Sequence, residues 1–410
     1  MSTDFIKVRQ DFPVLSRVIN GKTLVYLDSA NTSQKPRVVI DAMTAFLQHD
    51  YAPINRSGYQ MASEATDLYE GARIAVAKFI NAPNANEVIF TKNATEALNL
   101  IVRTWGLANL KRGDIVVLTH MEHHANMVPW HMLVAEIGIE LRFIPITPDG
   151  QLDLSTLDEL LIDAKVLSFT SMSNVLGTIT PAKLLCDAAH RAGAIAIVDG
   201  CQSVPHMVTD IQDMGADFLA FSSHKMCGPS GLGVLWGRQQ LLESMPPYMG
   251  GGNMIADVRL DGFTCAELPA KYEAGTPPIT EAIGLGAAVA YLNDVGMVNV
   301  QNHETEMASY AIDQLTKRLG DDIVIHGPTN PELRGATLSF ALKNIHPHDV
   351  SQILDQSNVC VRAGHHCAKP LMRLLGVNAT VRASFYLYNN HQDADSLCDA
   401  LEQAREFFSV

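Results

Sequence analysis

A lysine follows an apolar run near the middle of the chain, in Ser222-Ser223-His224-Lys225. The run 218–221 before it and Gly228-Pro229 after it are typical of a buried strand that ends at a turn. A lysine in that place is partly desolvated, and desolvation frees an amine to attack a carbonyl group. The alternative is an ordinary surface lysine, and this stretch alone does not decide between the two.

An anion site is indicated earlier, where the apolar run 88–90 leads through Asn93-Ala94-Thr95 into a helical pattern. Thr95 is expected to cap that helix, and the free N–H groups of a helix start bind anions such as phosphate. An ordinary N-cap without a ligand is the alternative.

Asp199 ends another buried run, 194–198, one strand before Lys225. A carboxylate at the mouth of a buried strand needs a cation or a hydrogen-bond donor, and a protonated pyridine nitrogen would serve. Asp199, Lys225 and a phosphate cradle together form the set of groups that pyridoxal phosphate requires. The lysine holds the cofactor, and the acid keeps the ring able to withdraw electrons.

Further side chains that could take part in a reaction, histidines and one cysteine, lie before and after these residues in the sequence. His123 and His124 follow Glu122. Because the rings of adjacent residues point in different directions, a shared metal ion is not expected. A flat imidazole could instead stack on an aromatic ring, or it could simply be hydrogen-bonded. Cys367 follows His365-His366 in a glycine-containing loop. Exposure and a nearby imidazolium would favour its thiolate, the nucleophilic form. An inert cysteine or a weak metal site are the alternatives.

Two arginines in the last part of the chain, Arg362 and Arg382, carry planar guanidinium groups suited to a carboxylate. For either one, a surface salt bridge is the alternative reading.

The elements that must position these groups alternate along the chain. Apolar strand candidates lie at 88–90, 115–118, 141–144, 166–169, 194–198, 218–221 and 233–236, with helical patterns between most of them. Such alternation indicates an α/β fold with a mainly parallel sheet, whose ligands bind at the carboxyl ends of the strands. Residues 246–280 read as a long irregular segment, about 280–318 as one long helix, and 320–410 as an α+β unit.

Composition narrows the function classes. The chain has 410 residues and a formal net charge of −14, which argues against nucleic acid or an anionic membrane as partner. No apolar run reaches the roughly 18 residues of a membrane helix, and the first residues lack a signal-peptide pattern, so a cytoplasmic protein is expected. The 7 cysteines are scattered and odd in number, which predicts free thiols and no metal cage.

These motifs resemble those of the group II cysteine desulfurases of the SUF system, within the class V aminotransferase superfamily of pyridoxal phosphate enzymes. The resemblance runs almost end to end. It rests on Asp11-Phe12-Pro13, Leu27-Asp28-Ser29-Ala30, Glu122-His123-His124-Ala125-Asn126, Ser173-Asn174-Val175-Leu176-Gly177-Thr178, Val198-Asp199-Gly200, Ser222-Ser223-His224-Lys225, Glu273-Ala274-Gly275-Thr276-Pro277 and Arg362-Ala363-Gly364-His365-His366-Cys367-Ala368.

The resemblance implies the pyridoxal phosphate fold type I, with a seven-stranded sheet in a large domain and a smaller α+β domain. It places an N-terminal segment at 1–30, joined to the small domain, the large domain at 31–295 and the small domain at 296–410. It also implies a homodimer that acts on L-cysteine, forms a persulfide on Cys367 and passes the sulfur to an acceptor of the SufE or SufU type for iron–sulfur cluster assembly.

Roles for single residues come from the same resemblance. Lys225 would be the Schiff-base lysine, His123 would stack on the ring, Asp199 would pair with its nitrogen, and Gln202 would bond its phenolic oxygen. Thr95, Ser222 and His224 would hold the phosphate together with Thr276 of the partner subunit. Asn174 and Arg382 would bind the substrate carboxylate, with Arg362 close by.

The chain departs from the family at Asn55-Arg56-Ser57-Gly58-Tyr59, where many relatives carry two histidines. The effect of Asn55 and Tyr59 on substrate approach or sulfur transfer is open. Two other functions stay open as alternatives: a selenocysteine lyase or aminotransferase that does not need Cys367, and a non-catalytic scaffold for a sulfur-transfer partner.

Overall fold

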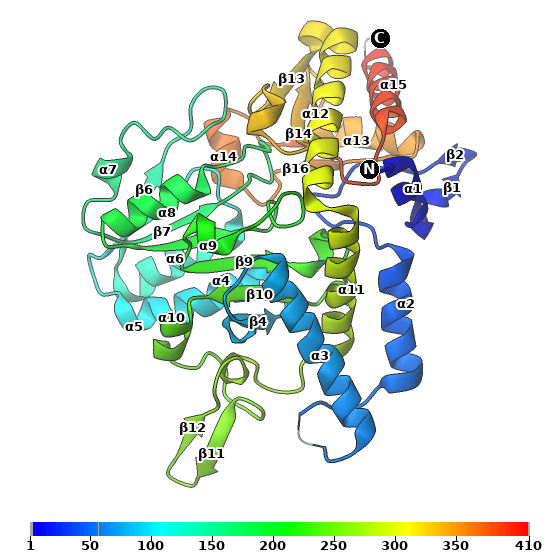
Figure 1. Ribbon diagram of the computed structural model, residues 1–410. Helices are drawn as coiled ribbons and strands as arrows, with labels where there is room; N and C mark the ends of the chain where they lie inside the picture. The colour runs from blue at the N-terminus through cyan, green and yellow to red at the C-terminus, as the bar shows by residue number, and fades with distance from the viewer. Residues whose placement is uncertain (1–2, 56, 409–410) are drawn as a thin grey trace.

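A seven-stranded sheet lies at the centre of the computed structural model, which describes residues 3–55 and 57–408 (Figure 1). Its order is β4-β10-β9-β8-β7-β5-β6. The strands are β4 (Val88–Thr91), β5 (Ile115–Thr119), β6 (Glu140–Ile144), β7 (Ala164–Thr170), β8 (Ile195–Asp199), β9 (Phe218–Ser222) and β10 (Gly233–Gly237). The pairings are parallel, apart from those of β10 with β4 and β9. The predicted α/β fold with a mainly parallel seven-stranded sheet is confirmed.

Both faces of this sheet are covered, which is why its strands are apolar almost throughout. Successive side chains of a strand point to opposite faces, and the buried residues divide accordingly. Val117 belongs to the cluster that contains residues of α3 (Gln60–Phe79) and α11 (Ile279–Val295). Its neighbour Val116 belongs to the cluster with α4 (Ala94–Ile101) and α6 (His124–Ile137). This packing on both faces of the sheet holds the ends of its strands in fixed positions.

The helical stretch after the large sheet is not the single helix that the sequence predicts over about 280–318. It consists of α11 and α12 (Met297–Leu319), bent by 74°. Gly296 lies between them with a φ of 85°, a left-handed backbone that glycine adopts without steric cost. Its N–H closes the last turn of α11 by donating to the carbonyl of Leu292, at 2.9 Å. The chain therefore changes direction here.

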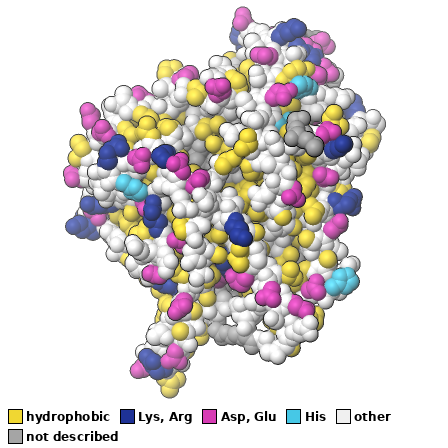
Figure 2. Space-filling view, viewed as in Figure 1, with side chains coloured by type: hydrophobic (Ala, Val, Ile, Leu, Met, Phe, Trp, Pro, Cys, Tyr) yellow, Lys and Arg dark blue, Asp and Glu magenta, His cyan; other side chains and the backbone are white. Residues whose placement is uncertain are grey.

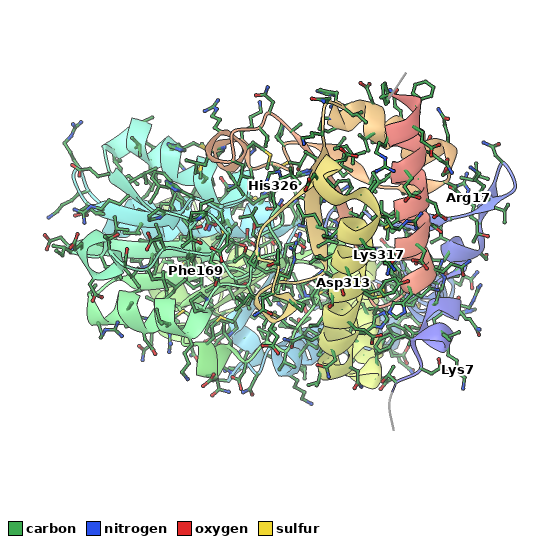
Figure 3. All side chains as sticks on the ribbon, turned by 90° about the horizontal axis from the view of Figure 1, so that it is seen from above. Lys7, Arg17, Phe169, Asp313, Lys317 and His326 are labelled. Carbon is green, nitrogen blue, oxygen red and sulfur yellow. The ribbon has the colours of Figure 1, made fainter. Side chains whose placement is uncertain are left out.

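Beyond the bend, a four-stranded antiparallel sheet has the order β13-β14-β17-β16. These strands are β13 (Ile323–His326), β14 (Thr337–Leu342), β16 (Arg362–Gly364) and β17 (Thr380–Ser384), and α12, α13 (Pro347–Gln356) and α15 (His391–Phe407) share a buried cluster with them. In the view from above, Asp313 and Lys317 lie on α12 beside α15, away from Phe169 in the large sheet (Figure 3).

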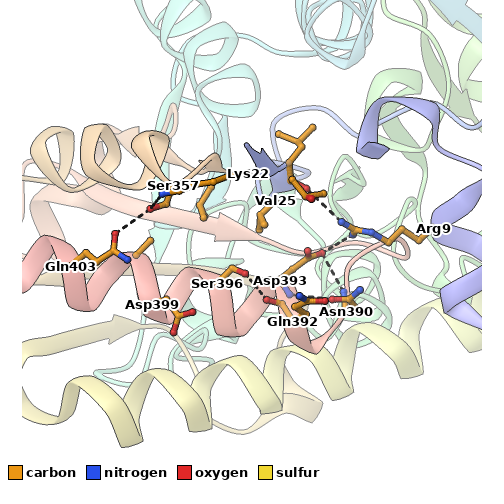
Figure 4. Close-up of a pocket in the computed structure, with 14 residues that line it drawn as sticks. Arg9, Lys22, Val25, Ser357, Asn390, Gln392, Asp393, Ser396, Asp399 and Gln403 are labelled. Carbon is orange, nitrogen blue, oxygen red and sulfur yellow. Dashed lines mark hydrogen bonds and ion pairs between the residues drawn. The ribbon is translucent and has the colours of Figure 1, made fainter. Parts of the chain in front are cut away.

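The start of the chain packs against this second sheet. Strand β3 (Val25–Tyr26) pairs in parallel with β15 (Val359–Cys360). A polar groove of about 440 Å³ lies between the N-terminal segment and α15. Figure 4 shows Arg9 reaching toward Asp393, whose Oδ2 accepts a hydrogen bond from Arg9 Nη1 at 2.8 Å. The same Nη1 also donates to the Tyr388 carbonyl, at 2.8 Å.

Residues 246–280 are not irregular throughout, as the sequence suggests. They include a hairpin of β11 (Ile255–Arg259) and β12 (Gly262–Cys265) that projects from the body of the molecule (Figure 1). Alternating apolar and polar residues on each side of the turn Leu260-Asp261 favour such a hairpin, but the surrounding prolines and glycines hide the pattern. Val258 and Phe263 are exposed on it.

On the face seen in Figure 2, acidic and basic side chains are interspersed, without a continuous basic area. Within residues 3–55 and 57–408, no single helix is both long and apolar enough to cross a membrane. Helices α11 and α12 meet that requirement only when taken together across their bend.

Candidate active site

A cavity of about 250 Å³ opens at the carboxyl ends of the large-sheet strands, facing the second sheet. All of the predicted site residues except Thr276 line it: Thr95, His123, Asn174, Asp199, Gln202, Ser222, His224, Lys225, Arg362, Cys367 and Arg382. Thr276 instead borders a shallow cavity that Asn55 and Ser57 share. Arg56, in the segment that departs from the family, lies outside the described residues.

The amine and the acid come from neighbouring strands. Asp199 is the last residue of β8 and is buried. Lys225 follows β9 in a short 3₁₀ turn, Ser223–Lys225, and is half-buried. Because β8 and β9 pair in parallel, both strand ends reach the same edge of the sheet. Asp199 Oδ1 accepts a hydrogen bond from the N–H of Cys201 at 3.0 Å, which orients the carboxylate at the cavity wall.

His123 presents a neutral ring. It caps α6, where Nδ1 accepts a hydrogen bond from the N–H of Ala125 at 3.1 Å, so the ring proton sits on Nε2. Burial, reinforced by the charge of Lys225, lowers the pKa of His123 to about 4. A flat, uncharged imidazole at a cavity wall is suited to stacking on an aromatic ligand.

Glu122, directly before His123, has a structural role that the sequence analysis did not assign. Its buried carboxylate accepts from Thr119 Oγ1 at 2.5 Å, Asn126 Nδ2 at 2.6 Å and the Thr170 N–H at 3.1 Å. Burial raises the pKa of Glu122 to about 8. The carboxylate ties the start of α6 to β7, which fixes the position of the His123 ring. In the sequence, the position of Glu122 beside two histidines suggested only a possible metal site, so this structural role was not predicted.

The expected helix start lines the cavity, but Thr95 is not its cap. Asn93 is the cap residue, and its Oδ1 accepts from the N–H of Glu96 at 3.0 Å. The short amide of Asn93 reaches the helix from the preceding turn, whereas Thr95 already lies within the first turn. Ser222 Oγ accepts from the N–H of Ala94 at 2.9 Å, which joins β9 to this corner. Burial and the charge of Lys225 lower the pKa of His224 to about 4.

The cationic side of the cavity is built on the second sheet. Arg382 is 1% exposed. Its Nη1 donates to the Asn174 carbonyl at 2.9 Å and its Nη2 to Asp28 Oδ1 at 3.3 Å, while its buried Nε has no hydrogen-bond partner in the part of the chain that the structure describes. Burial lowers the pKa of Arg382 to about 10, so it remains a cation. Arg362 Nη1 donates to Asn31 Oδ1 at 2.6 Å. An anionic ligand group would find a free buried donor here.

Cys367 lies between β16 and α14 (Lys369–Leu374) on a tightly held loop. Two hydrogen bonds hold the loop to residues that follow strands of the large sheet. The His124 N–H donates to the Cys367 carbonyl at 2.8 Å, and Asn174 Nδ2 donates to the His366 carbonyl at 2.7 Å. His366 and Cys367 have φ values of 50° and 56°, in the left-handed region. The thiol is half-buried rather than fully exposed, and it lines the cavity.

His366, directly before Cys367, is not the imidazolium that was expected there. Burial, followed by the charges of Arg382 and Arg362, lowers the pKa of His366 to about 2. His365 Nδ1 accepts a hydrogen bond from the Cys367 N–H at 3.1 Å. Arg382 interacts electrostatically with Cys367 and supplies a positive charge near the thiol.

The cavity fits pyridoxal phosphate by its donor set. An acid, an amine, a flat imidazole, a hydroxyl and a helix start surround it. Gln202 donates through Nε2 to the Ala30 carbonyl at 2.7 Å, and its buried Oε1 has no hydrogen-bond partner among the described residues. A ring hydroxyl would supply the missing donor. Within the part of the chain that the structure describes, no group of three or more metal-binding side chains occurs.

Comparisons with known proteins identify the family of the chain. The aminotransferase class-V family model matches residues 25–397. A probable cysteine desulfurase of Streptomyces coelicolor is 49% identical over 98% of this chain and 97% of its own length. A cysteine desulfurase of Haloferax volcanii is 45% identical over 99% of this chain and 98% of its own.

Solved structures show the same similarity. The apo cysteine desulfurase of Thermococcus onnurineus superposes with a TM-score of 0.93, at 37% identity, over 99% of this chain and 100% of that one. The Escherichia coli cysteine desulfurase CsdA, in an S-sulfonic acid form, gives a TM-score of 0.91 at 36% identity, over 98% and 99% of the two chains. The chain therefore belongs to the class-V aminotransferase family and, within it, to the cysteine desulfurases.

Proposed function

We propose that this protein converts L-cysteine to L-alanine and takes the sulfur onto Cys367 as a persulfide. One observation carries the proposal: Lys225, Asp199 and Cys367 line one cavity, although they come from three separate parts of the chain. An amine, an acid and a thiol in one cavity are the groups that this reaction needs. Relatives named cysteine desulfurase over nearly the whole chain support the same activity.

Pyridoxal 5'-phosphate is the cofactor proposed for this cavity. When bound, it supplies an electron-withdrawing ring that stabilises negative charge on the substrate carbon. Lys225 would hold its aldehyde carbon and Asp199 its ring nitrogen. We assign His123 to the ring face, Gln202 to the phenolic oxygen, and Thr95, Ser222 and His224 to the phosphate.

The substrate carboxylate is assigned to Arg382 and Asn174, with Arg362 close by. The free Nε of Arg382 is a buried hydrogen-bond donor that belongs to a positively charged guanidinium group, so it favours an anionic ligand. With its carboxylate held there, the substrate lies between Lys225 and Cys367. The Lys225 amine would then serve as the general base that removes the Cα proton of the substrate.

The sulfur step uses the thiol of Cys367. Its thiolate attacks the sulfur of the substrate, an S–S bond forms, and the bond between that sulfur and the substrate Cβ breaks. The electron pair of the broken bond stays on the substrate fragment, which is protonated and leaves as L-alanine. The chain retains the sulfur as a persulfide, ready for transfer to a second thiol.

We also propose the domain division 1–30, 31–295 and 296–410. Pairing of β3 with β15 supports assigning the N-terminal segment to the small domain. The bend at Gly296 and the separate buried cluster beyond it support the second boundary.

A homodimer is proposed, with Thr276 acting in the partner's cavity. Thr276 does not line the cavity that holds the other phosphate-site residues of its own chain, and it borders a separate cavity with Asn55 and Ser57. Helices α2 (Arg37–Ala45) and α3, with the segment between them, expose large apolar side chains that a second copy could cover: Val38, Ile40, Leu47, Tyr51, Tyr59, Met61, Leu68 and Ile74. Asn55 and Tyr59 would then border the shared entrance.

The partner proposed for the persulfide is a sulfur-acceptor protein of the SufE or SufU type, in the cytoplasm, for iron–sulfur cluster assembly. All of the cysteines are free thiols in the structure, which fits a reducing compartment. Nucleic acid is not proposed as a partner, given the net charge of −14.

The experiment that tests the proposal measures sulfide and alanine from L-cysteine, with a thiol reductant and pyridoxal phosphate, for the wild type and Cys367→Ala. Equal amounts of both products are expected from the wild type, and a loss of roughly three orders of magnitude or more from the variant. Cys265→Ala is the matched control, because Cys265 is also half-buried but lies on the projecting hairpin.

Alanine release that survives in Cys367→Ala would overturn the persulfide role and favour a lyase. The same pair of proteins assayed with L-selenocysteine separates the two functions, since selenide leaves readily without a thiol acceptor. Turnover of selenocysteine alone, equal in both proteins, would identify a selenocysteine lyase. Absence of any product from the wild type with a range of amino acids would favour a scaffold.

A further inference from the structure

Four donors converge on one backbone oxygen next to Lys225. The carbonyl oxygen of His224 accepts from the Ser33 N–H at 2.9 Å, from Thr32 Oγ1 and Ser33 Oγ at 3.1 Å each, and from Lys35 Nζ at 3.0 Å. A carbonyl oxygen has two lone pairs, so four donors are more than it ordinarily receives. This carbonyl carbon is bonded to the backbone nitrogen of Lys225, so the contacts act directly on that residue.

The same segment also holds the chain on the other side of Lys225. Ser33 Oγ accepts from the N–H of Cys227 at 2.8 Å. Cys227 has a φ of 64°, a left-handed conformation that costs free energy for a residue with a side chain. Residues 32–35 therefore clamp the turn both before and after Lys225, and they hold it in a conformation that local preferences disfavour.

Lys35 is the charged member of this clamp. Its Nζ also donates to the Ser33 carbonyl at 2.6 Å, and no ion pair with a carboxylate is found for it among the described residues. It is half-buried. Burial lowers the pKa of Lys35 to about 8, and its charge contributes to the lowered pKa of His224. A desolvated ammonium group on a peptide carbonyl makes a strong, charge-assisted hydrogen bond.

We propose that Lys35 is a positioning residue for Lys225: its ammonium group fixes the peptide between His224 and Lys225 and thereby aims the Lys225 amine into the cavity. The proposal rests on the proposed function only in taking Lys225 as the reactive amine. Residues 32–35 lie between β3, which pairs with the second sheet, and α2, so the clamp also ties the reactive turn to the start of the chain.

Two measurements test the proposal on Lys35→Met, which keeps the length of the side chain but removes its charge and donors. The first is amide hydrogen exchange of the peptide covering 223–228, measured without cofactor. The second is the rate at which pyridoxal phosphate attaches to Lys225, fixed by borohydride reduction and located by peptide mass spectrometry. Lys271→Met is the matched control, because Lys271 is also half-buried and donates to two backbone carbonyls, of Leu242 and Glu243.

In Lys35→Met we expect exchange in 223–228 to rise at least about tenfold, since a lost charge-assisted hydrogen bond lowers the local opening free energy. Attachment at Lys225 should slow by a similar factor. Lys35→Arg should recover part of both effects, and Lys271→Met should show neither. Thr32→Val, which removes one uncharged donor, should raise the exchange by a smaller factor and serves if Lys35→Met fails to fold.

Unchanged exchange and attachment in Lys35→Met would overturn the proposal while leaving the proposed function intact. Exchange that rises equally across β7 and β8 would also overturn it, because Lys35 would then support the fold in general. A wild type in which pyridoxal phosphate attaches to other lysines but not to Lys225 would overturn the proposed function, and the role of Lys35 with it. The exchange readout needs no cofactor and therefore separates these cases.

Discussion

Arg362 lies directly opposite Arg382 in the antiparallel pairing of β16 with β17. Directly opposite residues project from the same face of a sheet, and like charges in that position repel. Asp28 offsets only one of them, at 3.3 Å from Arg382, and Arg362 is bonded to the uncharged amide of Asn31. Two adjacent cations at a cavity wall, one of them with a free donor, are an arrangement that an anionic ligand stabilises.

Arg382→Met is expected to raise the KM for L-cysteine by about 30-fold or more, with a smaller change in kcat. Truncating one partner of a buried, hydrogen-bonded charge pair costs about 2–5 kcal/mol, and the carboxylate is present throughout the reaction. Steady-state kinetics of alanine formation give both constants. An unchanged KM would contradict the assignment of the substrate carboxylate to Arg382.

The sequence predicted the large sheet well because most of its strands are short, mainly apolar runs; the edge strand β6, with Glu140 and Arg142, is the most polar of them. The sequence did not predict the direction of β10, since a strand buried on both faces has no pattern that encodes orientation. The bend at Gly296 was missed because the helical periodicity continues on both sides of one glycine. The cap at Asn93 was misassigned to Thr95, because the exact first residue of a helix depends on the turn that precedes it.

The site was predictable where a residue type is itself unusual for its place, such as Asp199 and Lys225 at the ends of buried strands. Lys35 was not predictable. Its partner is the carbonyl of His224, a contact that spans 189 positions of the chain, and a lysine in a polar segment carries no signal for such a contact. The charge of His366 was also misjudged, because the burial that keeps it neutral is a property of the folded chain.

The left-handed backbone at Cys367 predicts an order of stability among inactive variants. Cys367→Gly should be more stable to urea than Cys367→Ala by about 0.5–1 kcal/mol, because a side chain at positive φ costs about 1–2 kcal/mol while glycine loses part of that as chain entropy. At Cys265, which lies in strand β12, the same pair of substitutions should show the opposite order. The same order of stability at both positions would contradict backbone strain at Cys367.

A buried ion pair between Arg73 and Glu273 holds the segment that leads to Thr276. Arg73 is 1% exposed and donates to both carboxylate oxygens of Glu273, at 2.7 and 2.9 Å. Arg73→Met should lower the free energy of unfolding by about 3–5 kcal/mol, since it leaves a buried carboxylate unpaired. Arg73→Met combined with Glu273→Gln should recover part of that loss. A double variant no better than the single one, in urea unfolding, would rule out charge as the cause.

The neutral state of His366 predicts a pH dependence of stability. His366 is 2% exposed, its Nε2 is 2.9 Å from Thr380 Oγ1, and its Nδ1 has no hydrogen-bond partner among the described residues. Its pKa is about 2 in the folded chain, against an ordinary value of 6.5 for an imidazole in water. Below pH 6.5 the unfolded chain therefore binds a proton that the folded chain does not. The contribution of His366 is fully present above pH 6.5 and is lost as the pH falls through the window from 6.5 to 2.

Comparing wild type with His366→Gln isolates this group. Each pH unit inside the window costs about 1.4 kcal/mol, so between pH 7.5 and pH 5 the wild type should lose about 2 kcal/mol more free energy of unfolding than the variant. Glu122 has the opposite sign, because its pKa is raised to about 8, but it is present in both proteins and cancels. Urea unfolding at the two pH values measures the difference, and parallel losses in both proteins would show that His366 is not held neutral by the fold.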